Sequence, residues 1–147
     1  MVAPVVQAAQ AAQSAYAAAA APWGIAAVGV GAALGAWSRW GLSLWFNSAN
    51  AAIPGGTLAC NLIGGYLIGI AVGFFASNPH LSPAWRLFAI TGFLGGLTTF
   101  STFSAESMAL LQRGQYVFVL GHSLVHLIGS VALCVAGFAT WRAIAAT

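Results

Sequence analysis

A run of glycine, hydroxyl and aromatic residues interrupts the apolar segment 85–111, and it reads Gly92-Phe93-Leu94-Gly95-Gly96-Leu97-Thr98-Thr99-Phe100-Ser101-Thr102-Phe103-Ser104. Because paired glycines and clustered hydroxyl residues make a poor continuous helix, we expect a break here. The freed carbonyl oxygens of such a break can coordinate a cation. Its hydroxyl groups, that of Thr99 among them, are uncharged donors, and the ring edges of Phe100 and Phe103 are electropositive, so the run could bind an anion. The alternative is a kinked helix whose hydroxyls bond to its own carbonyls.

Asn61 begins a row of small residues in the segment 55–76, since Gly65, Gly69 and Gly73 follow it at intervals of four residues. This spacing puts them on one helix face, where small residues let two helices approach closely. The Asn61 amide then lies at a packed seam. Its NH₂ group could donate to an anion, or it could form an interhelical hydrogen bond that only holds the helices together.

A polar stripe of His122, His126 and Ser130 runs along the otherwise apolar segment 116–140, again at intervals of four residues. Two histidines one turn apart could line a pathway, or they could bind a metal ion or haem. No cysteine or carboxylate accompanies them in the pattern, so a metal site has weak support. Histidine has an unperturbed pKa of about 6.5, so the stripe could also change its charge near neutral pH.

Arg39 lies toward the far end of the apolar segment 24–46. A cation in a membrane is costly without a partner, and the single acid of the chain, Glu106, is the only side chain able to act as its counter-ion. Arg39 would favour anions in a nearby vestibule. It could equally be a topological anchor or a cap at the helix C-terminus.

These residues are carried by long apolar segments. The chain is 61% hydrophobic and 3% charged, against roughly 25% charged residues in ordinary soluble domains. A bilayer core of about 30 Å needs about 20 apolar residues per helix, and four segments meet this length: 24–46, 55–76, 85–111 and 116–140. We therefore expect an all-α, multi-pass membrane protein of four transmembrane helices, with the third helix broken mid-membrane.

The four segments form one unit. Short joints rich in Asn, Ser, Gly and Pro connect them, so residues 22–147 are expected to make a single four-helix transmembrane domain. Residues 1–21 are rich in Ala and Gln and are expected to be an extension. The chain has no cluster of basic residues, so binding to nucleic acid is not expected.

The four arginines divide evenly between the two sides of a four-span chain. Arg86 and Arg142 fall on the side of the N-terminus, while Arg39 and Arg113 fall on the other side. Because an excess of basic residues normally marks the cytoplasmic side, a tie indicates either insertion in both orientations or simply a weak topology signal.

Three stretches resemble one family, the small fluoride channels called Fluc or CrcB. They are residues 31–40 (GAALGAWSRW), 56–66 (GTLACNLIGGY) and 91–103 (TGFLGGLTTFSTF). The resemblance extends from about residue 24 to the C-terminus, and the third stretch is highly specific to the family.

This resemblance implies a fluoride-selective channel that passively exports fluoride across the cell inner (plasma) membrane and relieves fluoride toxicity. It implies an antiparallel, dual-topology homodimer embedded in membrane lipid, with two pores. The fluoride pathway would comprise Asn61, Phe100, Phe103, Thr99, His122, His126, Ser130 and Arg39. The backbone carbonyls of Gly95 and Thr98, from both subunits, would hold a structural Na⁺ at the dimer centre.

The chain departs from the family in its last helix, because His122 and His126 stand where the polar track of familiar members tends to carry Tyr and Ser. Three other functions have less support in the sequence than a fluoride channel. A proton-coupled exporter would want a carboxylate in the segment 24–46, which has none. A haem-binding anchor would use the two histidines and show a Soret band, whereas an enzyme is not expected from a chain with a single acid.

Overall fold

The computed structural model describes residues 22–46 and 55–146, and all of their regular secondary structure is helical. The elements are α2 (Pro22–Phe46), α3 (Gly55–Ser77), α4 (Pro83–Arg86), the π-helix η1 (Leu87–Leu94), α5 (Gly95–Leu97), α6 (Phe100–Gln112) and α7 (Tyr116–Ala145). The prediction of an all-α chain is confirmed for these residues. The extension expected at 1–21 lies outside them.

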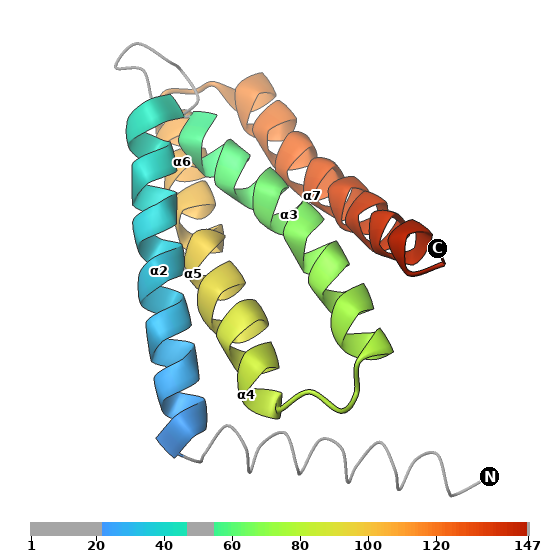
Figure 1. Cartoon of the computed structure of the whole chain (residues 1–147). Coiled ribbons are helices and arrows are strands. Elements are labelled where there is room, and N and C mark those ends of the chain that lie inside the picture. The colour runs from blue at the N-terminus through green and yellow to red at the C-terminus, as the bar shows by residue number, and fades with distance from the viewer. Residues whose placement is uncertain (1–21, 47–54, 147) are drawn as a thin grey trace, which may run out of the picture.

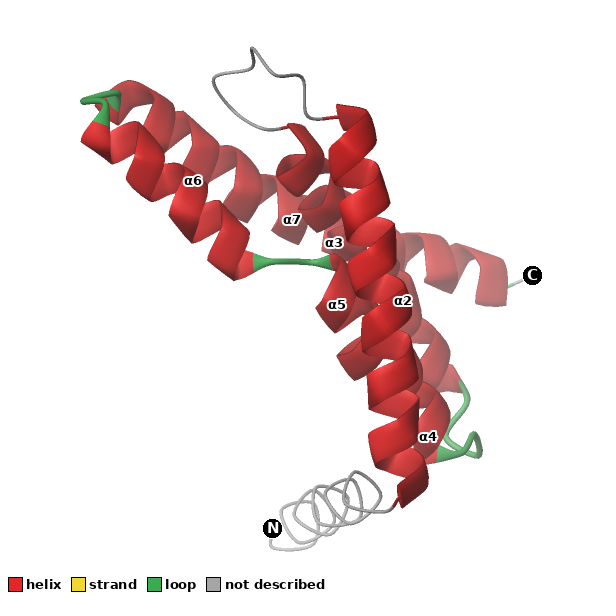
Figure 2. Cartoon of the chain, turned by 90° about the vertical axis from the view of Figure 1, so that its left-hand side faces the viewer, coloured by secondary structure: helices red, strands yellow, loops and turns green. Residues whose placement is uncertain are grey.

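The helices pack in two pairs (Figure 1). Helix α3 lies against α7, while α2 lies against η1 and α5, and a smaller contact joins α2 to α3. Beyond α5 the chain changes direction, so that α6 extends away from the axis of α2 (Figure 2). The third apolar segment therefore consists of two helical parts that point in different directions.

Close backbone contact defines the pairing of α3 with α7. A Cβ atom on Gly69 would collide with the carbonyl oxygen of Cys134, and one on Gly137 would collide with the carbonyl oxygen of Tyr66. Such an approach is possible only where neither position carries a side chain. The predicted use of the small-residue face of 55–76 in helix packing is thereby confirmed.

Three helical stretches of the described residues are long and apolar enough to cross a membrane: Gly55–Ser77, Pro83–Gln112 and Tyr116–Ala145. Helix α2 has 25 residues, but its glycines, tryptophans, serines and Arg39 lower its mean hydropathy, and it is not among the three. The chain is thus a multi-pass helical membrane protein by length and composition. The fourth span remains a prediction. Helix α7 also continues to Ala145, beyond the expected end at residue 140.

The third segment leaves helical geometry at two threonines. Thr98 has φ −86° and ψ 155°, and Thr99 has φ −151° and ψ 117°. Both are extended, so the interruption falls within the glycine and hydroxyl run. The sequence did not indicate that the part before it, Leu87–Leu94, is a π-helix. In this part Gly92 lies directly against Gly31 of α2.

Candidate functional site

Asn61 of α3 pairs with the backbone of Thr99 at the interruption. The Thr99 N–H donates to Asn61 Oδ1 at 2.8 Å, and Asn61 Nδ2 donates to the Thr99 carbonyl at 3.1 Å. The side-chain amide replaces the helical partners that an extended residue lacks, so Asn61 stabilises the interruption. Besides its expected role as a donor at a packed seam, Asn61 therefore positions the backbone of Thr99.

The same amide determines the tautomer of His126. Asn61 Nδ2 lies 3.1 Å from His126 Nδ1, and the two bonds to Thr99 orient Nδ2, the donor end, toward the ring. Nδ1 therefore accepts, and the proton of the neutral imidazole resides on Nε2. Both amide hydrogens of Asn61 have acceptors in this arrangement.

The interruption diverts two backbone donors away from their helical acceptors. In a continuous helix the N–H groups of Thr99 and Thr102 would donate to the carbonyls of Gly95 and Thr98. Here Thr99 N–H donates to Asn61, and Thr102 N–H donates to Thr99 Oγ1 at 3.1 Å. The two carbonyls expected to bind sodium are thus the two whose usual donors are taken by side chains.

Several hydroxyls of the run bond within their own helix, as the alternative interpretation of the sequence proposed. Thr98 Oγ1 donates to the Leu94 carbonyl at 2.9 Å, and Ser104 Oγ donates to the Phe100 carbonyl at 2.8 Å. Thr99 Oγ1 instead caps the start of α6. The run therefore both breaks the helix and caps the helix that follows.

Phe103 and the two histidines of α7 form a cluster of rings. Phe103 stacks on His122 with ring centroids 5.0 Å apart and 24° between planes, and it contacts His126 at 4.9 Å. The His122 and His126 rings meet edge to face at 4.4 Å, which leaves no space for a porphyrin between them. The packing of the two rings therefore argues against the haem-binding alternative.

Phe100 contacts Phe103 with ring centroids 5.4 Å apart, yet 80% of the surface of Phe100 is exposed.

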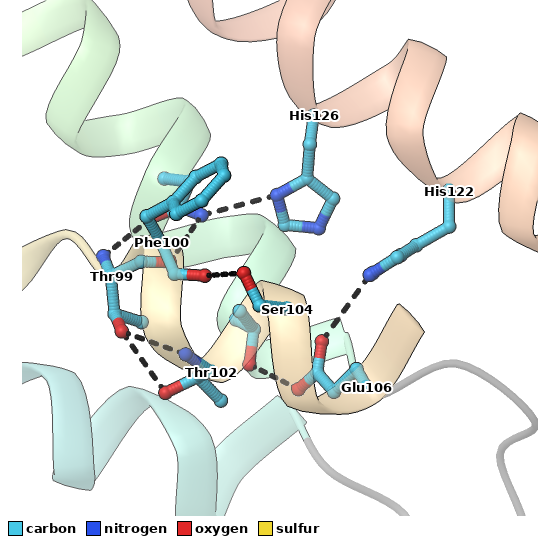
Figure 3. Close-up of polar contacts among 9 residues, drawn as sticks. Thr99, Phe100, Thr102, Ser104, Glu106, His122 and His126 are labelled. Atoms are coloured by element: carbon cyan, nitrogen blue, oxygen red, sulfur yellow. Dashed lines mark hydrogen bonds and ion pairs between the residues drawn. The ribbon is translucent and has the colours of Figure 1, made fainter. Parts of the chain in front are cut away.

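Glu106 of α6 lies among polar side chains from α3 and α7. Thr57 Oγ1 donates to Glu106 Oε1 at 2.5 Å, and His122 Nε2 lies 3.5 Å from Glu106 Oε2. Figure 3 shows the His122 ring pointing from α7 toward this carboxylate. Sequence reasoning missed both Thr57 and the neighbourhood of Glu106. A signal was present, because Thr57 precedes Asn61 by one helical turn on the same face.

Arg39 does not pair with the acid. Among the described residues the one ion-pair contact of Glu106 is with His122, and the Nε atom of Arg39 is buried without a hydrogen bond. The pairing of Glu106 with Arg39 that charge allowed does not form, because the Glu106 carboxylate faces Thr57 and His122 instead. The Arg39 carbonyl accepts a weak hydrogen bond from the Cys60 thiol at 3.8 Å.

A cavity of about 500 Å³ collects most of the expected site residues. Its lining includes Asn61, Gly95, Thr98, Thr99, Phe100, Phe103, His126 and Ser130. His122 and Arg39 are not part of this lining, although His122 contacts His126. Residues from α3, α5, α6 and α7 therefore line one cavity, which combines uncharged donors and ring edges.

Known proteins resemble the chain over most of its length. The profile of the CrcB-like protein family, Camphor Resistance (CrcB), matches residues 26–138. A protein of Cupriavidus pinatubonensis named "Fluoride-specific ion channel FluC" is 60% identical over 124 residues, which cover 84% of this chain and 98% of that protein. Proteins with the same name from Ralstonia pickettii and Pseudomonas putida are 59% and 55% identical, covering 81% and 78% of this chain and 94% and 91% of theirs.

Proposed function

The chain belongs to the CrcB-like family, and from this premise we propose that it is a fluoride-specific ion channel that exports fluoride passively. The observation that carries this function is the 60% identity to a named fluoride channel over 98% of that channel's length. Its activity is therefore ion conduction and not catalysis. The channel acts in the inner (plasma) membrane, where efflux of the ion relieves fluoride toxicity.

Fluoride crosses through the cavity beside the interruption. The ion is small and strongly hydrated, so loss of its water must be offset by several donors at close range. His126 Nε2–H, the Ser130 hydroxyl and the edges of Phe100 and Phe103 are the uncharged donors. The Thr99 hydroxyl, which donates to Thr102 Oγ1 at 3.0 Å, joins them when that bond opens. Fluoride also competes with His126 Nδ1 for one amide hydrogen of Asn61. His122 extends the track toward Glu106, and Arg39 attracts anions into the vestibule.

The channel works as an antiparallel homodimer of four-span subunits inserted in both orientations. Support comes from the even division of arginines between the two sides and from the exposure of Phe100, a proposed pathway residue that is 80% uncovered in the single chain. A second copy would complete the wall of the cavity at Phe100. Membrane lipid covers exposed apolar side chains of α7, such as Val117 and Val135.

A structural sodium ion is held by the carbonyls of Gly95 and Thr98 from both subunits. The fit rests on the diversion of Thr99 N–H and Thr102 N–H to side-chain acceptors, which releases these two carbonyl oxygens from their usual helical role. Carbonyl oxygens are suitable ligands for a hard monovalent cation. When bound, the ion would tie the two interruptions together at the dimer centre.

The test is ion release from proteoliposomes that contain the purified full chain. Fluoride and chloride efflux are followed with ion-selective electrodes after a potassium ionophore removes the opposing voltage. Fast fluoride release with little chloride release is expected. Equal rates for the two ions, or release no faster than from protein-free liposomes, would reject the function.

A further inference from the structure

Three ionisable side chains from α6 and α7 converge where Figure 3 shows the His122 ring and Glu106 facing each other. One ligand atom each from Glu106, His122 and His126 lies within 4.8 Å of the others. The two histidines are 3% and 6% exposed. Glu106 Oε2, His122 Nε2 and His126 Nε2 are all buried without a hydrogen-bond partner. Such orphaned polar atoms are costly, so three of them side by side call for a bound species.

The donor set indicates what that species is. Two imidazole nitrogens and one carboxylate oxygen are the three protein ligands of zinc sites whose fourth position is open to water or another small ligand. We infer that Glu106, His122 and His126 bind a first-row divalent transition-metal ion, with Zn²⁺ as the probe, and that its open position faces the fluoride pathway. The sequence showed only two histidines without a carboxylate, and folding supplies the missing acid from another helix.

The spacing of the donors suits such an ion. Ligands about 2.0 to 2.1 Å from a tetrahedral zinc lie about 3.4 Å apart, and His122 Nε2 is 3.5 Å from Glu106 Oε2. The other distances between the three donor atoms, which are no longer than 4.8 Å, must shorten when the ion binds. Thr57 donates to the other carboxylate oxygen, and Phe103 stacks on the His122 ring and contacts the His126 ring. These contacts orient the donors before the ion arrives.

Metal binding competes with the Asn61 contact. As a metal ligand, His126 Nε2 must lose its proton, and the ring then carries its proton on Nδ1. That proton would face the donating Asn61 Nδ2, now 3.1 Å away. Binding therefore separates Asn61 from His126, while the two bonds from Asn61 to Thr99 can persist. The metal site and the proposed fluoride track cannot both use His126 Nε2 at the same time.

This competition gives a consequence that rests on the proposed channel function. Zn²⁺ at the cluster removes the His126 donor from the track and adds a divalent charge that retains fluoride or hydroxide at the open position. Micromolar Zn²⁺ is therefore expected to slow fluoride efflux, and a chelator is expected to restore it.

The binding itself is tested on purified dimer without a polyhistidine tag, by calorimetric titration with Zn²⁺. One ion per chain is expected. His122→Tyr, His126→Ser and Glu106→Gln should each weaken binding by at least about tenfold. The matched control is His80→Ala, since His80 is the remaining histidine and is exposed in the loop after α3. Unchanged affinity in the three cluster variants, or loss of affinity in the control, would overturn the proposal.

A measurement on the wild-type chain covers the case in which a variant fails to fold. Co²⁺ replaces Zn²⁺ in such sites and gives intense visible absorption bands when four-coordinate. Intense bands that Zn²⁺ displaces are expected, whereas weak six-coordinate bands or no bands would overturn the site. Efflux is read separately: binding without inhibition removes the regulatory consequence alone, and no efflux at any metal concentration rejects the channel function while the binding result stands.

Discussion

Asn61 and Thr99 lie 38 positions apart in the chain, yet they pair as two strand residues would, with one hydrogen bond in each direction. The Asn61 side chain offers an acceptor and a donor at the separation of a peptide group, so it can satisfy both polar groups of one extended residue. The remaining amide hydrogen meets His126. One side chain thus joins the interruption of the third segment to the polar stripe of the last helix.

Asn61→Leu is expected to reduce fluoride efflux by at least about tenfold, which corresponds to about 1.4 kcal/mol on the barrier. It removes the amide donor and leaves the Thr99 N–H and carbonyl without partners, at a cost of about 1 to 3 kcal/mol for each unsatisfied group. Efflux and the thermal midpoint are measured together. Asn78→Leu is the control, because the Asn78 side chain donates within its own turn, to the Phe74 carbonyl, and does not line the cavity. Wild-type efflux in a folded Asn61→Leu protein would mean that Asn61 serves packing alone.

Phe100→Ile is expected to impair fluoride efflux while the protein still folds. The substitution keeps an apolar side chain but removes the electropositive ring edge from the cavity. Phe118→Ile is the matched control, since Phe118 is also exposed, at 51%, and does not line the cavity. Equal losses in both variants would mean that Phe100 has no special place in conduction.

Gly69→Ala is expected to destabilise the fold by about 1 to 3 kcal/mol through overpacking, because the new methyl group would meet the Cys134 carbonyl of α7. Gly121→Ala makes the same change in α7 where nothing lies within 4 Å, so it should be neutral or raise the midpoint by improving helix propensity. Thermal unfolding in detergent, followed by size-exclusion chromatography, compares the two. A lower midpoint for Gly121→Ala than for Gly69→Ala would contradict the packing of α3 on α7.

A cysteine-free chain with one reporter cysteine at the C-terminus should react with a membrane-impermeant thiol reagent from both sides of the membrane. The even division of the arginines provides no preference for one orientation. Labelling of intact cells is compared with labelling of inverted vesicles. One added arginine next to Arg86 gives the side of the N-terminus an excess of basic residues, so labelling should then shift to one side of the membrane. Labelling of the original chain from a single side would exclude insertion in both orientations.

The helices could be predicted from the sequence, because helix formation and membrane solvation depend on neighbouring residues. Apolar length predicted α3, the third segment and α7 to within a few residues at most ends. The spacing of Gly65, Gly69 and Gly73 predicted a face for close packing, and the clustered glycines and hydroxyls predicted where the third helix stops. Each of these properties is local or periodic, so it can be read along one segment.

The contacts between side chains of different helices could not be predicted from the sequence, because they depend on how the helices pack. Thr57 and Glu106 are 49 positions apart and Asn61 and His126 are 65 apart, so neither contact leaves a periodic trace in the chain. A single acid allowed Arg39 as partner by charge, but the contacts of α6 with α3 and α7 placed Glu106 beside Thr57 and His122. Helix spacing specifies which residues share a face, whereas the rotation and crossing of helices specify which faces touch.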